Sequence, residues 1–440
     1  MSKTPIFDFI KKYADSGASR LHMPGHKGIE SLGCEKYDIT EFHGADSLFE
    51  ADGIIAESEK NLSDIYNSRA SFYSAEGSSL CIRAMIYMAM QHSDGKKKIL
   101  AGRNAHKSLL SALALCDVEA DWLYGDDLYS CKISPEELDK ALGGDEYFAV
   151  YVTCPDYLGN MIHLPTLAQV CHKHNIPLLV DNAHGAYLKY TGHHPMDNGA
   201  DMCCDSAHKT LSCLTGAAYL HVSKSAIYPY EIHAKKAMSL FASTSPSYLI
   251  MASMDLMNEK SLNGYEAKIR ETSMMVDELR ANLSHLGFEF SGREKLKVNI
   301  KPKPFGYTGN ELASLLEGDG MYPEFCDDDN LVFMFSPDNG AGDFEKITKF
   351  FSGLDRKTPV ISTPPKPARP QKVMDVRSAM FSPSEVVNVE DAEGRILASP
   401  CVSCPPAIPV AVCGERLDSL CIENFKYYGI KNIEVVKMNK

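Results

Sequence analysis

The sequence lacks long apolar runs and an excess of basic residues, and each absence excludes a class of protein. No stretch approaches the ~20 consecutive apolar residues of a membrane-spanning helix, and the charged N-terminal stretch Met1–Gly17 is unlike a signal peptide. The formal net charge of −13 makes phosphate-rich nucleic acid a poor partner. We therefore expect a cytoplasmic protein that binds neither membrane nor nucleic acid.

A disulfide framework and a zinc site are also not indicated. The 14 cysteines are scattered over 440 residues without the pattern of a small stapled scaffold. We expect them to be reduced and to behave as small buried apolar residues. Cys401 and Cys404 form one C-x-x-C motif, but no second pair stands at zinc-like spacing, so no bound metal is predicted.

Repeats and low-complexity tracts are absent apart from one proline-rich connector, Ser362–Pro370. Proline cannot continue a helix or a central strand, so this connector separates folded parts. The length suggests more than one domain. We expect an N-terminal segment, a large α/β domain, a small α+β domain, a linker and a C-terminal module, at residues 1–45, 46–285, 286–361, 362–372 and 373–440.

Short apolar runs alternate with amphipathic stretches from about residue 70 onward. The candidate strands are Lys98–Ala101, Tyr147–Thr153, Ile176–Asp181, Asp201–Asp205 and Ala217–Val222. The segments that resemble helices are Ser78–His92, Ser108–Leu115 and Leu164–His174. Continuously apolar strands that are separated by helices indicate a mostly parallel sheet covered on both faces, and hence an α/β domain.

The pattern changes after Val222. Residues 231–286 are mainly helical in character, and Phe288–Lys301 and Asn330–Phe335 look like strands with a helix at Asn310–Glu317 between them. This pattern predicts a smaller α+β unit.

Polar clusters follow several of the predicted strands. Asp181 and Asp205 each close an apolar run, the segment Arg103–Ser108 follows the strand that ends near Ala101, and Glu76-Gly-Ser-Ser79 precedes a helix. Ligands of parallel α/β sheets bind outside the carboxyl ends of the strands. Four polar clusters in such positions therefore predict one ligand site.

These clusters contain the groups that pyridoxal phosphate (PLP) requires. PLP needs a lysine for a Schiff base, for which Lys209 is the candidate, and an acid against its pyridinium nitrogen, for which Asp181 is placed. The turn of Gly77, Ser78 and Ser79 into a helix offers backbone N–H groups and the positive end of a helix dipole to the phosphate.

Each of these residues also has an ordinary structural interpretation. Asp181 or Gly77 alone would more often be part of a helix cap or turn, and a lone loop lysine is usually solvated. His106, His184 and His208 could be structural histidines, or metal ligands together with Asp181. The sequence has no local ligand pair on one helix at these positions, so PLP is favoured over a metal.

The chain resembles a known family in an ordered series of motifs. These are His22-Met-Pro-Gly-His-Lys-Gly28, Arg103-Asn-Ala-His-Lys-Ser108, Val180-Asp-Asn-Ala-His-Gly185, His208-Lys-Thr-Leu211, and, near the C-terminus, Glu393-Gly-Arg-Ile396 and Pro405-Pro-Ala-Ile-Pro409. The series is similar to the bacterial-type ornithine/lysine/arginine decarboxylases. These are fold-type I PLP enzymes, with an aminotransferase-like large domain and a mostly parallel seven-stranded sheet.

The resemblance implies a role for each matching residue. Lys209 would carry the cofactor, Asp181 would pair with the pyridinium, and His106 would stack over the ring. His184 would help to fix the cofactor. Ser206 and His208 would assist the turn at residues 77–79 in holding the phosphate. The N-terminal segment would line the active site, and a homodimer with its active site at the subunit interface is expected.

The sequence departs from the family pattern at four positions. Glu76 stands where the family usually has Asn, Asn182 replaces Glu, Ala207 replaces Thr, and Cys404 replaces a Tyr before the C-terminal Pro-Pro pair. The chain also looks like a short form, without the receiver-like N-terminal domain of the long members.

These observations predict a PLP-dependent decarboxylase of a basic L-amino acid, with arginine, lysine and ornithine all open as substrates. Such an enzyme belongs to amino-acid metabolism and polyamine biosynthesis. Two alternatives remain: another PLP reaction on the same fold, such as aminotransfer or β-elimination, and a non-catalytic PLP-binding paralogue. Arg293 and Arg377 are candidates for the carboxylate-binding arginine of a transaminase.

Overall fold

The computed structural model describes residues 3–130, 133–144, 146–400 and 408–438. Cys401, Cys404 and Pro405–Ala407 therefore lie outside the described residues. The chain divides into two compact units. The first contains residues up to 96 with 139–151 and 163–269, and the second contains 97–138, 152–162 and the residues from 270 onward.

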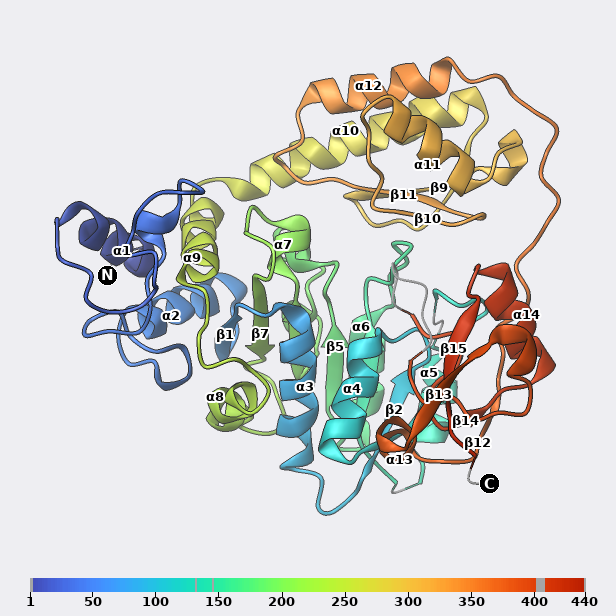
Figure 1. Cartoon of the computed structure of the whole chain (residues 1–440), viewed down its shortest axis with the longest axis horizontal. Coiled ribbons are helices and arrows are strands. Elements are labelled where there is room, and N and C mark those ends of the chain that lie inside the picture. Colours follow the sequence, from blue (N-terminus) through green and yellow to red (C-terminus); the bar gives the residue numbers. More distant parts are fainter. Residues whose placement is uncertain (1–2, 131–132, 145, 401–407, 439–440) are drawn as a thin grey trace. The chain divides into compact units, whose positions relative to one another are not determined.

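A seven-stranded sheet forms the large α/β part (Figure 1). Its strands are β1 (Ala70–Ser74), β2 (Lys98–Gly102), β3 (Glu119–Leu123), β4 (Tyr147–Thr153), β5 (Leu178–Asp181), β6 (Met202–Asp205) and β7 (Ala218–Val222). The strand order is β1-β7-β6-β5-β4-β2-β3. β5 pairs with β6 and β2 with β3 in parallel, whereas β7 runs antiparallel to both β1 and β6.

Burial explains why the central strands are mainly apolar. Every residue of β5, β6 and β7 is buried, as expected for strands that are covered on both faces. Within the first unit, α3 packs against β6 and β7. The α-helices up to residue 262 are α1 (Pro5–Asp15), α2 (Ile54–Tyr66), α3 (Gly77–Met90), α4 (Lys107–Cys116), α5 (Pro135–Ala141), α6 (Leu164–Lys173), α7 (Ala207–Thr210), α8 (Glu231–Ser239) and α9 (Tyr248–Leu262).

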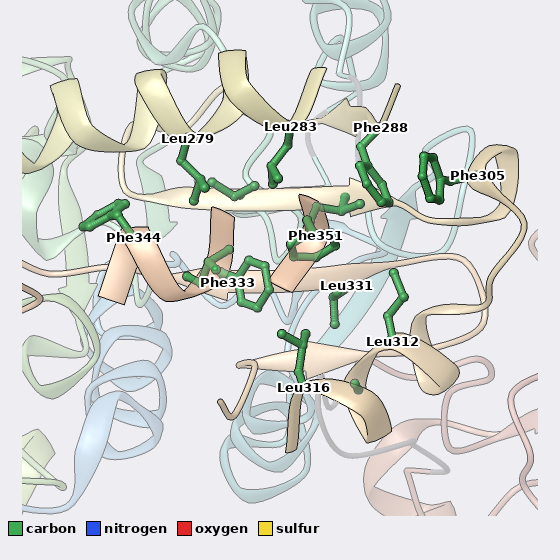
Figure 2. Close-up of a cluster of buried hydrophobic side chains, with 14 of the residues drawn as sticks. Leu279, Leu283, Phe288, Phe305, Leu312, Leu316, Leu331, Phe333, Phe344 and Phe351 are labelled. Atoms are coloured by element: carbon green, nitrogen blue, oxygen red, sulfur yellow. The ribbon is translucent and has the colours of Figure 1, made fainter. Parts of the chain in front are cut away.

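The second unit contains a smaller sheet with its own core. The strands β8 (Glu289–Ser291), β9 (Lys297–Lys301), β10 (Phe325–Cys326) and β11 (Leu331–Met334) are ordered β10-β11-β9-β8. The helices α10 (Tyr265–Leu286), α11 (Gly309–Gly318) and α12 (Ala341–Ser352) supply the rest of this part. Figure 2 shows Leu and Phe side chains of this part gathered in one cluster, among them Leu279, Phe333 and Phe351. The rings of Phe288 and Phe305, in the connecting segments, have centroids 4.0 Å apart.

A further core lies in the C-terminal part of the second unit. It is built on two short sheets, β12 (Gln371–Lys372) with β14 (Glu415–Arg416) and β13 (Ser384–Asn388) with β15 (Asn432–Val436). The helices α13 (Val376–Phe381) and α14 (Ser419–Tyr427) accompany them. Leu397, Leu417, Phe425 and Val435 are among the buried members of this core.

The predicted fold class is confirmed: the chain is α/β with a mostly parallel seven-stranded sheet, followed by smaller C-terminal sheets. The five strands and the helices that the sequence predicts in this part are present to within one or two residues. Each described cysteine is free, and most are buried, as expected. The predicted domain boundaries stay a prediction. Within the described residues, no helix combines the length and the apolar character that a bilayer crossing requires.

Candidate active site

Lys209 lies in α7, the short helix that begins two residues after the end of β6. Its Nζ atom is 2.9 Å from Nε2 of His184, which lies in the loop after β5. β5 and β6 are adjacent parallel strands, so their carboxyl ends bring the two loops together. The structure therefore joins two of the predicted site residues in one hydrogen bond.

Asp181 is the last residue of β5, and only 2% of its surface is exposed. Its Oδ1 atom accepts a hydrogen bond from the backbone N–H of Ala183 at 3.1 Å and contacts the thiol of Cys204 at 3.7 Å. Its Oδ2 atom accepts a hydrogen bond from the hydroxyl of Tyr151 at 3.1 Å. A buried carboxylate that is held by several donors is suited to a fixed cationic partner such as a pyridinium.

The turn at residues 77–79 meets the loop after β6. The hydroxyl of Ser206 lies 2.8 Å from that of Ser78, at the N-terminal end of α3. Gly77 has φ +71°, and nothing lies within 4 Å of the position where a Cβ would be. Two hydroxyls, a helix N-terminus and open space beside a glycine suit an anionic phosphate.

One backbone group of this turn already has a partner within the protein. The backbone N–H of Gly77 is not available to a ligand, because it donates to the carbonyl of Gly216 at 2.7 Å. The contribution of this glycine is its backbone conformation, which a residue with a Cβ rarely adopts.

The unusual Glu76 has a structural explanation. Its Oε1 atom accepts a hydrogen bond from the backbone N–H of Ser243 at 2.7 Å. The carboxylate is therefore used to hold the segment between α8 and α9. The predicted phosphate site next to Glu76 therefore does not require this carboxylate to contact the anion.

A second buried carboxylate, Asp205, ends β6. Its Oδ1 accepts a hydrogen bond from the side-chain amide of Asn182 at 2.6 Å, and its Oδ2 accepts from Nε2 of His194 at 3.0 Å and of His221 at 3.3 Å. Burial alone would raise the pKa of Asp205, but the two histidines outweigh it and hold that pKa below its usual range. The ionised carboxylate of Asp205 thus links Asn182, the residue after Asp181, to β6, the strand that precedes Lys209.

The remaining predicted histidines have structural partners. Nδ1 of His208 lies 2.8 Å from the carbonyl of Ala217. His106 belongs to the second unit, where it caps α4: its Nδ1 accepts a hydrogen bond from the backbone N–H of Ser108 at 3.1 Å. The phosphate contact of His208 and the ring stacking of His106 stay predictions, as does the phosphate contact of Ser79.

The three predicted histidines do not form a metal centre with Asp181 within the described part of the chain. The group there whose possible ligand atoms lie within 4.8 Å of one another is His194, Asp205 and His221. Nδ1 of His194 accepts a hydrogen bond from the backbone of Met196, so a neutral His194 carries its proton on Nε2. That proton points at Asp205, which makes this group a hydrogen-bond network.

The residues of the first unit fit PLP. A lysine amine, a buried carboxylate and paired serine hydroxyls at a helix N-terminus are the groups that such a cofactor needs. In addition, Oγ1 of Thr210, next to Lys209, is buried and has no hydrogen-bond partner among the described residues. An unsatisfied buried hydroxyl beside the lysine is consistent with a polar ligand at this position.

Sequence reasoning missed two contacts of the site. Tyr151 lies in a predicted strand, but its partner Asp181 is 30 residues away. The contact between Asn182 and Asp205 joins two strand ends that are 23 residues apart. The one available signal was position, because polar residues at the carboxyl ends of neighbouring strands tend to meet.

Comparison with known proteins identifies the family. Residues 4–284 match the model of the Orn/Lys/Arg decarboxylase major domain, and residues 360–430 match the C-terminal domain of the same family. An arginine decarboxylase of Bacillus subtilis is 25% identical over 98% of this chain and 94% of its own length. An arginine decarboxylase of Halalkalibacterium halodurans is 27% identical over 94% of this chain and 91% of its own length.

A solved structure supports the same fold. The constitutive lysine decarboxylase of E. coli superimposes with a TM-score of 0.78 at 18% identity, covering 99% of this chain and 82% of that one. The match of the major-domain model spans more than half of the sequence and includes Lys209, Asp181 and the turn at residues 77–79. The chain therefore belongs to the Orn/Lys/Arg decarboxylase family.

Proposed function

We propose that this protein is a PLP-dependent enzyme that removes the α-carboxylate of a basic L-amino acid as CO2, with arginine, lysine or ornithine as the substrate. The observation that carries the proposal is the arrangement at the ends of β5 and β6. There Asp181 and the pair of Lys209 and His184 lie on two adjacent strands and their loops, and Ser206 in the loop after β6 meets Ser78 at the start of α3. Family membership supports the reaction class.

Each residue has a defined task in this proposal. Lys209 would hold the cofactor, Asp181 would keep its ring nitrogen protonated, and Ser78 with Ser206 would bind its phosphate. Bound PLP supplies an electron sink for the bond that breaks at the substrate Cα. Nε2 of His184 can accept a proton from the Lys209 amine and return it, since the two atoms are 2.9 Å apart.

The test is product analysis of the PLP-loaded protein with arginine, lysine and ornithine. We expect CO2 and the matching amine from one of them, and we expect Lys209→Ala to abolish both turnover and the visible absorption of bound PLP. A keto acid would instead indicate aminotransfer, and an elimination product would indicate a lyase of another kind. A parent protein that takes up no PLP would contradict the proposal.

We further propose that the protein is a homodimer with its active site at the subunit interface, and that it acts in the cytoplasm in polyamine biosynthesis. Four large apolar side chains in the N-terminal segment, Leu21, Met23, Ile29 and Leu32, are 66–93% exposed. Such a group of exposed side chains is typical of a surface that a partner covers. Measurement of the mass in solution tests the dimer.

A further inference from the structure

The two oxygen atoms of the Asp181 carboxylate differ in the number of their hydrogen-bond partners. Oδ1 has two partners close in the fold: the N–H of Ala183, two residues along the chain, and the thiol of Cys204 on the adjacent strand β6. Among the residues that the structure describes, Oδ2 accepts from one donor, the hydroxyl of Tyr151 at 3.1 Å. The orientation of the second oxygen therefore depends on a single side chain.

Tyr151 can act only as a donor in this contact. The side chain is fully buried in β4. Burial raises the pKa of Tyr151 well above its usual value, and the charge of Asp181 raises that pKa further. The phenol thus stays protonated at neutral pH, and it donates to the carboxylate.

A hydrogen bond to a carboxylate has two effects on that group. It fixes the carboxylate plane, and it withdraws negative charge from the oxygen that accepts it. Both effects bear on a pyridinium partner, because the strength of that pair depends on the direction and the charge of the carboxylate oxygens.

We propose that Tyr151 is a positioning residue that orients the Asp181 carboxylate and limits the negative charge it presents to the ring nitrogen of the cofactor. The inference rests on the proposed function, since it concerns the same cofactor. Tyr151 itself touches neither cofactor nor substrate in this account. It acts through Asp181.

The first test is Tyr151→Phe, which removes one oxygen atom and keeps the ring. We expect the purified apoprotein to bind PLP about tenfold more weakly, because the carboxylate is no longer oriented. We also expect the pH midpoint of the visible band of Lys209-bound PLP to rise by about 0.5–1 unit, since the fuller negative charge of Asp181 favours the protonated chromophore.

The matched control is Tyr230→Phe. The Tyr230 hydroxyl is buried and has no hydrogen-bond partner in the described residues, so its removal reports on the loss of a buried hydroxyl alone. We expect the control to keep the parent midpoint and the parent PLP affinity. A Tyr151→Phe protein whose midpoint and affinity match those of Tyr230→Phe would overturn the inference.

A second variant decides the question if Tyr151→Phe does not fold. Difluorotyrosine at position 151 has nearly the size of tyrosine but is a stronger hydrogen-bond donor. We expect it to move the midpoint downward, opposite to Phe, and a shift upward or no shift contradicts the proposal. Failure of the proposed function is distinguishable, because then the parent protein itself shows no Lys209-dependent band.

Discussion

At the scale of single residues, the buried carboxylate of Asp205 is the centre of a hydrogen-bond network that joins four residues. Its side chain is fully buried and accepts three hydrogen bonds, from Asn182, His194 and His221. A buried charge of this kind is stabilising only while all of its donors are in place. Removal of the charge leaves two imidazole N–H groups facing an amide.

We therefore expect Asp205→Asn to lower the free energy of unfolding by about 3–5 kcal/mol, measured by urea denaturation at pH 7. Asp64→Asn is the control, since the Asp64 side chain forms an exposed ion pair with Lys60, which contributes about 0.3–0.5 kcal/mol. A loss for Asp205→Asn no larger than that for Asp64→Asn would show that the network is not a stabilising one.

The Asp205 carboxylate also contributes to the pH dependence of the free energy of unfolding. The pKa of Asp205 in the folded state lies below that of an unfolded aspartate, so its stabilising contribution is present above about pH 4. The contribution is lost only as the pH falls further, through the folded-state value. Near neutral pH this residue adds no pH dependence.

At the scale of elements, Asp255 joins α9 to α1 and titrates in a different range. Its Oδ2 atom accepts a hydrogen bond from the backbone N–H of Phe7 at 2.9 Å, and Oδ1 accepts one from Ser58 on α2. Burial raises the pKa of Asp255 to about 7, although the hydrogen bonds from Ser58 and the backbone lower it. The unfolded chain therefore releases this proton at lower pH than the folded protein does.

The direction in which stability changes with pH follows from this difference between the folded-state and unfolded-state pKa of Asp255. As the pH rises from about 4 to the folded-state pKa, the unfolded state is favoured and stability falls. We expect the free energy of unfolding to drop by about 2–3 kcal/mol from this group between pH 5 and pH 8, and Asp255→Asn to remove the drop. Urea denaturation at both pH values tests this, with the exposed Asp15→Asn as the control, and equal slopes in all three proteins would contradict it.

Elements differ in how far the sequence predicts them. β4, β5 and β6 are predictable because burial on both faces requires continuous apolar runs. β1 and β3 are missed, since Ala70–Ser74 carries two serines and Glu119–Leu123 lies at the edge of the sheet with polar residues between apolar ones. A short run of that composition is as typical of a loop as it is of a strand.

The candidate site is likewise only partly predictable from the sequence. Lys209, Asp181 and the turn at residues 77–79 are predictable because strand ends and a recognisable motif mark them. The contacts of Glu76 with Ser243 and of Tyr151 with Asp181 are set by tertiary packing. No local pattern encodes a partner 167 residues away.

At the scale of the whole molecule, Arg103 shows how one segment of the second unit stabilises the C-terminal part of the same unit. Its guanidinium donates to the carbonyls of Pro409 and Val410 at 2.9 and 3.2 Å and pairs with Glu415 at 3.4 Å. It also lies 5.5 Å from the ring centroid of Trp122. The first residue of the Arg103–Ser108 motif is thus structural, and it reaches across more than 300 positions of sequence.

Loss of this guanidinium would leave Glu415 buried without its cation. Burial already raises the pKa of Glu415, and Arg103 is the main influence that lowers it. We expect Arg103→Met to speed the hydrogen exchange of backbone amides in residues 408–417 by tenfold or more, roughly the effect of a local destabilisation of at least 1.4 kcal/mol. Arg356→Met, at an exposed arginine of the same unit, should leave this exchange unchanged.

A double variant separates charge from packing. In Arg103→Met with Glu415→Gln the unpaired carboxylate is gone, so we expect part of the protection to return. The carbonyls of Pro409 and Val410 would still lack their donor, so protection should stay below that of the parent. Equal exchange in the single and double variants would mean that the carbonyl contacts, and not the ion pair, hold residues 408–417 in place.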